Sequence, residues 1–134
     1  AEYGRQVSVW MSSSVVCRPT EREAVDYLDY YTVEKGDWPG VASLNRQPDV
    51  LARLQALPES ERKAEMRQLV AGSFNMQVLV GTADQIADRM RRLSEAGVDG
   101  LNMTFVNYQD ELRRVTTEVL PLLEQAGLRR PFAP

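Results

Sequence analysis

The chain has 134 residues, of which 43% are apolar and 26% are charged, the composition of one globular domain. Its net charge is −3, and acidic and basic residues are mixed along the chain, so nucleic acid is not an expected partner. No apolar run is long enough to cross a bilayer, and no secretory signal is visible, so no membrane association is expected. A single cysteine excludes an internal disulfide and favours a cytoplasmic location, and the lack of histidine excludes imidazole metal ligands and bases.

The first half of the chain is predicted to contain one strand followed by helices. Residues 6–17 (QVSVWMSSSVVC) read as a strand, and the serine run at 12–14 is expected to bend it or mark its end. Thr20 and Glu23 have the spacing of a capping box, and the helix that they open is predicted to end at Lys35-Gly36. The segments that follow are a turn at 37–40, a loop to residue 48, and short helices over 49–57 and 59–70.

The second half alternates strands and helices. Residues 77–80 are predicted to form a short strand and Thr82 to open a helix that ends at Gly97. Residues 100–106 (GLNMTFV) form the clearest strand pattern. Asn107 is expected to cap a last helix, in which Pro121 should cause a bend. The side chains that this helix is expected to bury are Leu112, Val115, Val119, Leu122 and Ala126.

Strands that alternate with helices indicate βαβ units and parallel pairing, so the fold class is α/β. A parallel sheet has to be covered on both faces or closed into a barrel, and two clear strands with one short strand do neither. Because a (β/α)₈ barrel needs about 250 residues, the chain could supply only the last part of one. The pattern alone is equally compatible with a small α/β domain of unusual strand order.

Several segments resemble the luciferase-like flavin monooxygenases, whose members commonly read "LVGTPEQVADRL", then "EAGVDG", a strand, a "DY…L" helix start and "EVLPLL". The opening also fits, because a strand leads through a Pro-Thr-Glu turn into a helix. The matching segments are LVGTADQIADR at 79–89, EAGVDG at 95–100, Asn107-Tyr108 with Leu112, VLPLL at 119–123, and the opening at 4–7 and 15–21.

This resemblance implies a TIM barrel of which residues 1–134 are the C-terminal segment, incomplete in this chain and containing the last two β/α units with an insertion. It also implies an FMN-dependent oxidoreductase: reduced FMN comes from a separate flavin reductase, reacts with dioxygen and oxygenates a small organic substrate. The protein positions the flavin and excludes water. No metal is implied, and the catalytic residues are expected upstream of this segment.

Barrel active sites lie at the C-terminal ends of the strands, which nominates six residues for contact with flavin or substrate. In the last strand, one face is expected to meet the helices and the other to face the lumen. Each candidate has a structural alternative: strand-to-strand hydrogen bonds, packing of the tryptophan, or stapling of a helix start by the tyrosine. The candidates are Trp10, Ser12, Asn102, Thr104, Val106 and Tyr108.

Four side chains outside this set are not expected to form the site. Arg5, Arg18 and Trp38 could reach a phosphate or line an entrance, although a solvated surface position is the preferred interpretation. Cys17 is expected to be a small buried apolar residue.

Two other functions stay open at this point. The chain could be a non-catalytic or self-assembling barrel fragment, in which two copies pair to a homo-oligomer and cover exposed edges. It could also be an unrelated small α/β binding domain.

Overall fold

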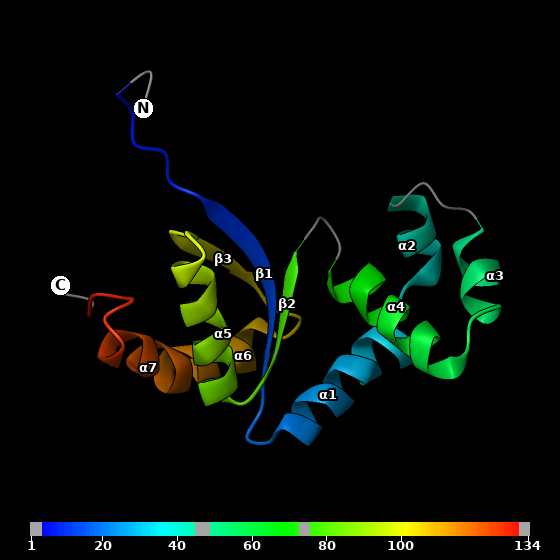
Figure 1. Ribbon diagram of the computed structural model, residues 1–134. Helices are drawn as coiled ribbons and strands as arrows, with labels where there is room; N and C mark the ends of the chain where they lie inside the picture. Colours follow the sequence, from blue (N-terminus) through cyan, green and yellow to red (C-terminus); the bar gives the residue numbers. More distant parts are fainter. Residues whose placement is uncertain (1–3, 45–48, 73–75, 132–134) are drawn as a thin grey trace.

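A parallel sheet of three strands lies in the middle of the computed structural model, which describes residues 4–44, 49–72 and 76–131 (Figure 1). The strands are β1 (Trp10–Cys17), β2 (Gln77–Gly81) and β3 (Gly100–Thr104), and their order across the sheet is β2-β1-β3. The predicted α/β class with parallel pairing is therefore confirmed.

Strand β1 is the central strand because its two halves pair with different neighbours. Residues 10–14 pair with all of β3, and residues 13–17 pair with all of β2. The serine run lies inside the strand, so the expectation that it marks the end of the strand is wrong. Ser13 and Ser14 are buried where both neighbours pair, since small side chains fit a site enclosed on every side. The strand also begins later than predicted, at Trp10, because residues 6–9 have no strand beside them in the described structure.

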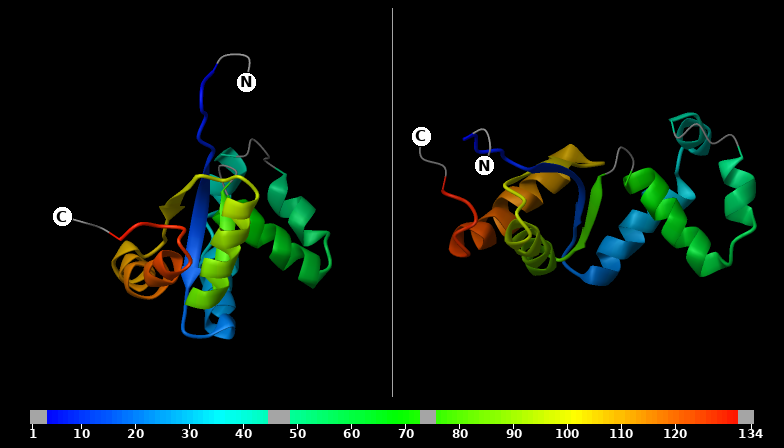
Figure 2. Two further views of the ribbon diagram at one scale, coloured as in Figure 1. Left: turned by 60° about the vertical axis from the view of Figure 1, so that its left-hand side comes forward. Right: turned by 45° about the horizontal axis from the view of Figure 1, so that its top comes forward.

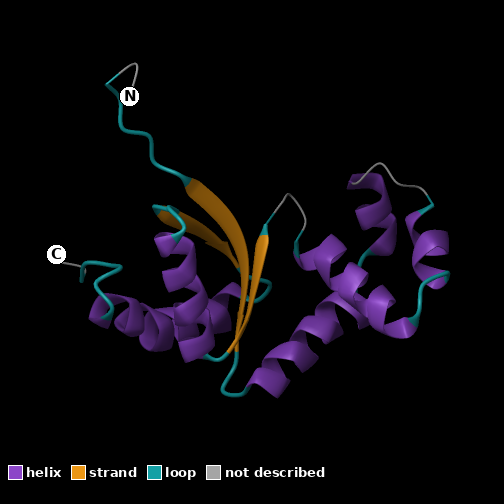
Figure 3. Ribbon diagram, viewed as in Figure 1, coloured by secondary structure: helices purple, strands orange, loops and turns teal. Residues whose placement is uncertain are grey.

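Helices lie on both sides of the sheet (Figures 2 and 3). One group follows β1 and extends away from the sheet, and the second group follows β2 and β3 on the opposite side. Two segments, η1 and η3, are single π-helical turns that continue α1 and α6. The bounds are α1 Glu21–Asp29, η1 Tyr30–Glu34, α2 Trp38–Leu44, α3 Val50–Gln55, α4 Glu59–Ala71, α5 Ala83–Glu95, α6 Tyr108–Arg114, η3 Val115–Val119 and α7 Leu120–Gln125.

Two apolar cores result, one on each face of the sheet. The larger core joins odd-numbered residues of β1, such as Val15, to α5, η3 and α7. It includes Phe105 as a buried member, with Leu101 and Met103 packed beside it, which confirms that this face of the last strand meets the helices. The smaller core joins Val16 and the face of β2 beside it to α1 and α4.

Side-chain caps start α1, α5 and α6 at the positions that the sequence predicts. Thr20 and Thr82 each accept from a backbone N–H three residues later, and both capping boxes are complete. Asn107 accepts from the backbone N–H of Asp110 at 3.4 Å. One predicted turn is instead a helix: α2 begins at Trp38, because the carboxylate of Asp37 accepts from the backbone N–H of Gly40 at 3.1 Å.

The last helical stretch buries a different set of residues from the one predicted. Val115 and Val119 are buried as expected, but Leu112 and Ala126 are exposed. Glu111 and Leu123 are buried in their place, so the buried positions recur at every fourth residue. An ideal α-helix has 3.6 residues per turn, so residues spaced by four would gradually turn away from the core. The π-helical turn η3 contains more residues per turn and therefore keeps these side chains on the buried side.

We predict that Thr82→Ala lowers the free energy of unfolding by about 1 kcal/mol, because the N–H of Gln85 loses its acceptor at the start of α5. Ser94→Ala, an exposed change in the same helix, is the control and should change it by less than about 0.5 kcal/mol. Urea unfolding followed by circular dichroism measures both. Equal values for the two variants would contradict the capping role.

Candidate functional site

Four of the six candidate residues have the same parity in the register of β1 and β3. Ser12 is directly opposite Asn102 and Thr104 is opposite Ser14, so these side chains point to the side away from α5 and α7. Trp10, opposite Gly100 at the start of β1, is the exception, because it borders a pocket lined by residues of α5 and α7. Asn102 and Trp10 are exposed, whereas Ser12 and Thr104 are partly covered. The alternation predicted for the last strand is therefore present, and its polar face is open in the described structure.

The same four residues are spread along the strands. Trp10 lies at the N-terminal end of β1, four residues from the position opposite Thr104, a separation of about 13 Å along the strand. Ligands of parallel α/β folds bind beyond the C-terminal ends of strands. The structure therefore separates Trp10 from the end of the sheet at which Thr104 lies.

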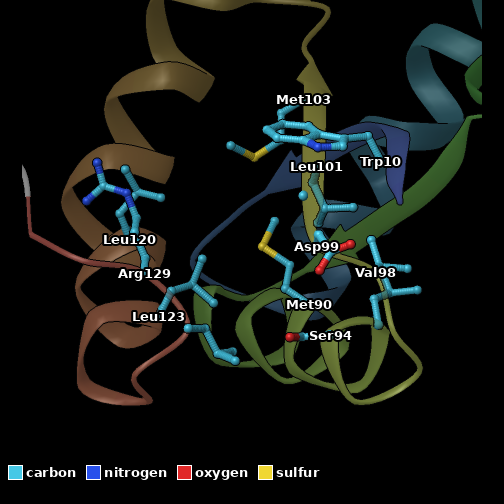
Figure 4. Close-up of a pocket in the computed structure, with 13 residues that line it drawn as sticks. Trp10, Met90, Ser94, Val98, Asp99, Leu101, Met103, Leu120, Leu123 and Arg129 are labelled. Atoms are coloured by element: carbon cyan, nitrogen blue, oxygen red, sulfur yellow. The ribbon is translucent and has the colours of Figure 1, made fainter. Parts of the chain in front are cut away.

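Trp10 instead borders a pocket at the N-terminal end of the sheet. The pocket has a volume of about 320 Å³, and its wall contains Leu101 and Met103 from β3, residues of α5, and Leu120 and Leu123 from the last helical stretch (Figure 4). The indole ring also lies over Gly100, where an added Cβ would come within 2.7 Å of it. These contacts correspond to the packing alternative for Trp10, although the side chain is 68% exposed.

Thr104 is tied to the neighbouring strand. Its hydroxyl donates to the carbonyl oxygen of Ser13 at 3.2 Å and lies 3.3 Å from the sulfur of Met76. This is the strand-to-strand hydrogen bond that the sequence left as an alternative to ligand contact.

The two remaining candidates follow the last strand. Val106 is 56% exposed and Tyr108 is 57% exposed. The ring of Tyr108 meets that of Phe105 edge to face, with 5.4 Å between the centroids, so this side chain packs against the end of the last strand at the start of α6. Both lie beyond the C-terminal end of β3, where a ligand of a parallel sheet is expected.

A buried ion pair at the C-terminal end of β1 was not found from the sequence. Glu111 of α6 is fully buried, and its Oε2 accepts from the backbone N–H of Cys17 at 3.1 Å. Its Oε1 pairs with the guanidinium of Arg18, which also donates to the carbonyl oxygen of Cys17 at 2.6 Å. Arg18 is only 16% exposed, so the expectation of a solvated arginine is wrong. The signal in the sequence was the four-residue series from Glu111 to Leu123, which places a carboxylate on the apolar side of the helix.

An aromatic pair closes this cluster on the side of α1. The guanidinium carbon of Arg18 lies 3.9 Å from the centre of the Tyr27 ring, and the Tyr27 and Tyr31 centroids are 5.5 Å apart. The hydroxyl of Tyr31 is buried beside Ser14 but makes no hydrogen bond of good geometry within the described residues. Burial raises the pKa of Tyr31 to about 12, so the phenol is neutral.

Cys17 has the buried, apolar environment predicted for it. The side chain is fully buried in the larger core, and burial, with further contributions from Glu118 and Glu111, raises the pKa of its thiol to about 11. A thiol of this kind is neither a nucleophile nor a metal ligand at neutral pH. Within the described ranges, no group of three acidic or cysteine side chains could hold a metal ion. Over the same ranges, no helix combines the length and hydropathy that a bilayer crossing needs.

We predict that the thiol of Cys17 lowers the stability of the folded chain at alkaline pH. The pKa of this thiol is 9.0 in the unfolded chain and about 11 in the folded chain, so between these pH values the unfolded state binds fewer protons. The free energy of unfolding should therefore fall as the pH rises from about 9 to about 11. Urea unfolding at several pH values should show a shallower fall for Cys17→Ala, which retains the contribution of Tyr31. The same slope in both proteins would contradict the assignment.

The sequence of this chain is similar to a known protein family and to individual members of it. The family model for luciferase-like monooxygenases matches residues 1–100. An FMNH(2)-dependent dimethylsulfone monooxygenase of Pseudomonas putida is 30% identical over 137 residues, which cover 99% of this chain and 37% of that protein. The enzyme of the same name from Pseudomonas fluorescens (strain Pf0-1) is 29% identical over 123 residues, covering 89% of this chain and 33% of that protein.

Two solved structures have the same arrangement of elements. DmoA from Hyphomicrobium sulfonivorans matches with a TM-score of 0.69 at 19% identity, over 95% of this chain and 32% of that one. A riboflavin lyase (RcaE), solved with modified FMN and riboflavin, matches with a TM-score of 0.64 at 22% identity, over 96% of this chain and 34% of that one. The chain thus spans about a third of the length of these proteins. With three quarters of its length matched by the family model, this chain belongs to the luciferase-like monooxygenases.

Proposed function

We propose that this chain is the C-terminal segment of a (β/α)₈ barrel in an FMN-dependent monooxygenase that oxygenates a small organic substrate. The observation that carries the proposal is the asymmetry of the sheet. Helices α5 and α7 cover one face, whereas the opposite face is open at Asn102, beside the first half of β1. A barrel strand has this character, with helices outside and a lumen inside.

The strand pairing supports the barrel. Strands β1 and β3 are parallel neighbours, as consecutive barrel strands are, and β2 pairs only with the second half of β1, from Ser13 onward. On the β2 side, Trp10 to Ser12 therefore have no partner within the described residues. Helices α1 and α4 pack on Val16, at the C-terminal end of the open face. They would then belong to an insertion that covers part of the barrel mouth.

The described residues fit part of a flavin site. Asn102 offers an exposed amide, which can both donate and accept, and Val106 and Tyr108 offer apolar surface beyond the C-terminal end of β3. We place these three residues at the wall of the flavin or substrate pocket. Ser12 lies on the same face directly beside Asn102, on the neighbouring strand, and Trp10, at the N-terminal end of β1, serves packing.

The flavin, delivered in reduced form by a separate reductase, would supply the redox chemistry with dioxygen when it is bound. The residues of this chain would orient the ring and exclude water at the C-terminal end of the sheet. Because the chain spans about a third of its relatives, the remaining wall and the catalytic groups would come from other barrel strands. Alone, this segment should show no turnover.

We predict that Asn102→Ala, in a complete enzyme that contains this segment, weakens FMN binding or lowers kcat/KM by roughly tenfold, which corresponds to one lost hydrogen bond of about 1.4 kcal/mol. Flavin fluorescence titration and an oxygenation assay with a flavin reductase measure the two effects. Ser94→Ala, on the helix outside the sheet, is the control. Wild-type values for both quantities in Asn102→Ala would remove this residue from the site.

The open sheet face also favours a second role, self-assembly into a homo-oligomer. Trp10 and Val106 are more than half exposed, and β2 and β3 are edge strands of the described sheet. Two copies could cover these surfaces for each other. Sedimentation equilibrium of the isolated chain should then show a dimer that dissociates on dilution, and a monomer throughout the micromolar range would contradict this role.

A further inference from the structure

The pocket at the N-terminal end of the sheet is separate from the site proposed above. Its wall includes Leu101 and Met103, on the face of β3 opposite to that of Asn102. Figure 4 shows Leu120 and Leu123 on one side of the pocket, which is the side of α7. Because protein interiors contain few voids, a space of about 320 Å³ between two helices and a strand is a candidate for a ligand.

The size and lining of the pocket select an apolar molecule. Its volume of about 320 Å³ is roughly twice that of an engineered cavity of about 150 Å³ that binds benzene, so it has room for one ring and a short chain. Apart from Ser94, Asp99, Gly100 and Arg129, every described residue that lines it is apolar. One of them is Met90, whose flexible side chain can adapt to the shape of a ligand.

The pocket also carries one negative charge that has no cationic partner. Its charged lining residues are Asp99 and Arg129, and Arg129 pairs with Glu124 outside the pocket. The carboxylate of Asp99 accepts from the backbone N–H of Val9 at 2.7 Å. No ion pair in the described part of the chain includes Asp99. A cationic group on a ligand would therefore be attracted to this carboxylate, and an anionic group would be repelled.

Trp10 adds a second feature that attracts a cation. One face of its indole ring lies over Gly100, and the side chain is still 68% exposed, so the ring is held on one side and accessible on the other. The face of a tryptophan ring binds cations better than that of the other aromatic side chains. The backbone N–H of Asp99 donates to the carbonyl oxygen of Val9 at 2.8 Å, which holds the carboxylate beside the strand residue next to Trp10.

We propose that this pocket binds a small apolar ammonium ion, a protonated amine that carries an aromatic ring or a short alkyl chain. The apolar part enters between α5 and α7 over Leu101 and Met103, and the ammonium group contacts Asp99 and Trp10 at the rim. Every residue on which the proposal depends belongs to this chain, and no flavin takes part. The proposal is therefore independent of the monooxygenase function proposed above.

Three molecules of similar shape and different charge test the proposal: phenethylammonium, phenethyl alcohol and phenylpropanoate. Each is titrated into the ¹⁵N-labelled chain at about pH 7, where an alkylamine is protonated. The observed signals are the indole Nε1–H resonances of Trp10 and Trp38, assigned with Trp38→Phe. Trp38 begins α2, on the other side of the sheet from α7, and serves as an internal control (Figure 1).

We expect phenethylammonium to shift the Trp10 resonance saturably and to leave that of Trp38 unchanged. Its Kd should be about fivefold to tenfold lower than that of the alcohol, and phenylpropanoate should bind most weakly. Asp99→Asn keeps an acceptor for Val9 but removes the charge, so it should reduce the affinity for the ammonium to that for the alcohol. Asp84→Asn removes an equal charge at an exposed position in the first turn of α5 and should behave as wild type.

The wild-type titrations decide the matter even if Asp99→Asn does not fold. The absence of a saturable Trp10 shift with phenethylammonium, or equal affinities for the ammonium and the alcohol, would overturn the proposal. An unchanged preference for the ammonium in folded Asp99→Asn would overturn it as well. A Trp10 resonance that moves when the ligand-free chain is diluted would show a second copy of the chain in the pocket, which is also incompatible with the proposal.

Discussion

Strand β1 is the constraint on which the rest of the described structure depends. It pairs along both edges and packs on both faces, so its side chains have to fit four neighbours at once. Ser13 and Ser14 lie where the two neighbouring strands overlap, and Val15 and Val16 divide between the two cores. A larger residue at either serine would separate strands or helices, since the interior has little space to absorb extra volume.

Local signals in the sequence predicted the starts of three helices correctly. The capping boxes at Thr20 and Thr82 and the cap at Asn107 formed as predicted, because each involves a side chain and a backbone group three residues apart. The alternation of β3 also predicted its helix-packed face, including Phe105. These features need no knowledge of which strand lies beside which.

Features that depend on tertiary contacts were the ones predicted incorrectly or missed. The periodicity of an α-helix selected Leu112, whereas the π-helical turn η3 keeps Glu111 on the buried side. Nothing within the helix itself requires a carboxylate there. Its partners, Cys17 and Arg18, are more than 90 residues away along the chain, so the pair becomes visible only when β1 and α6 are brought together. For the candidate site, the sequence found the shared face of Ser12 and Asn102 but placed Trp10 with them, because alternation alone carries no information on the two ends of a strand.

The Glu111–Arg18 ion pair makes the C-terminal end of β1 polar, whereas its N-terminal end is apolar. At the N-terminal end, Trp10 is largely exposed over Gly100 beside an apolar pocket, and no charge is buried. At the C-terminal end, Glu111 and Arg18 are largely removed from water, which costs on the order of several kcal/mol for each ion and is offset only by close pairing and further hydrogen bonds. An apolar side chain in place of Glu111 would also leave the buried N–H of Cys17 without its acceptor. The polar pair therefore fixes α6 to the end of β1 and fixes the direction of Arg18.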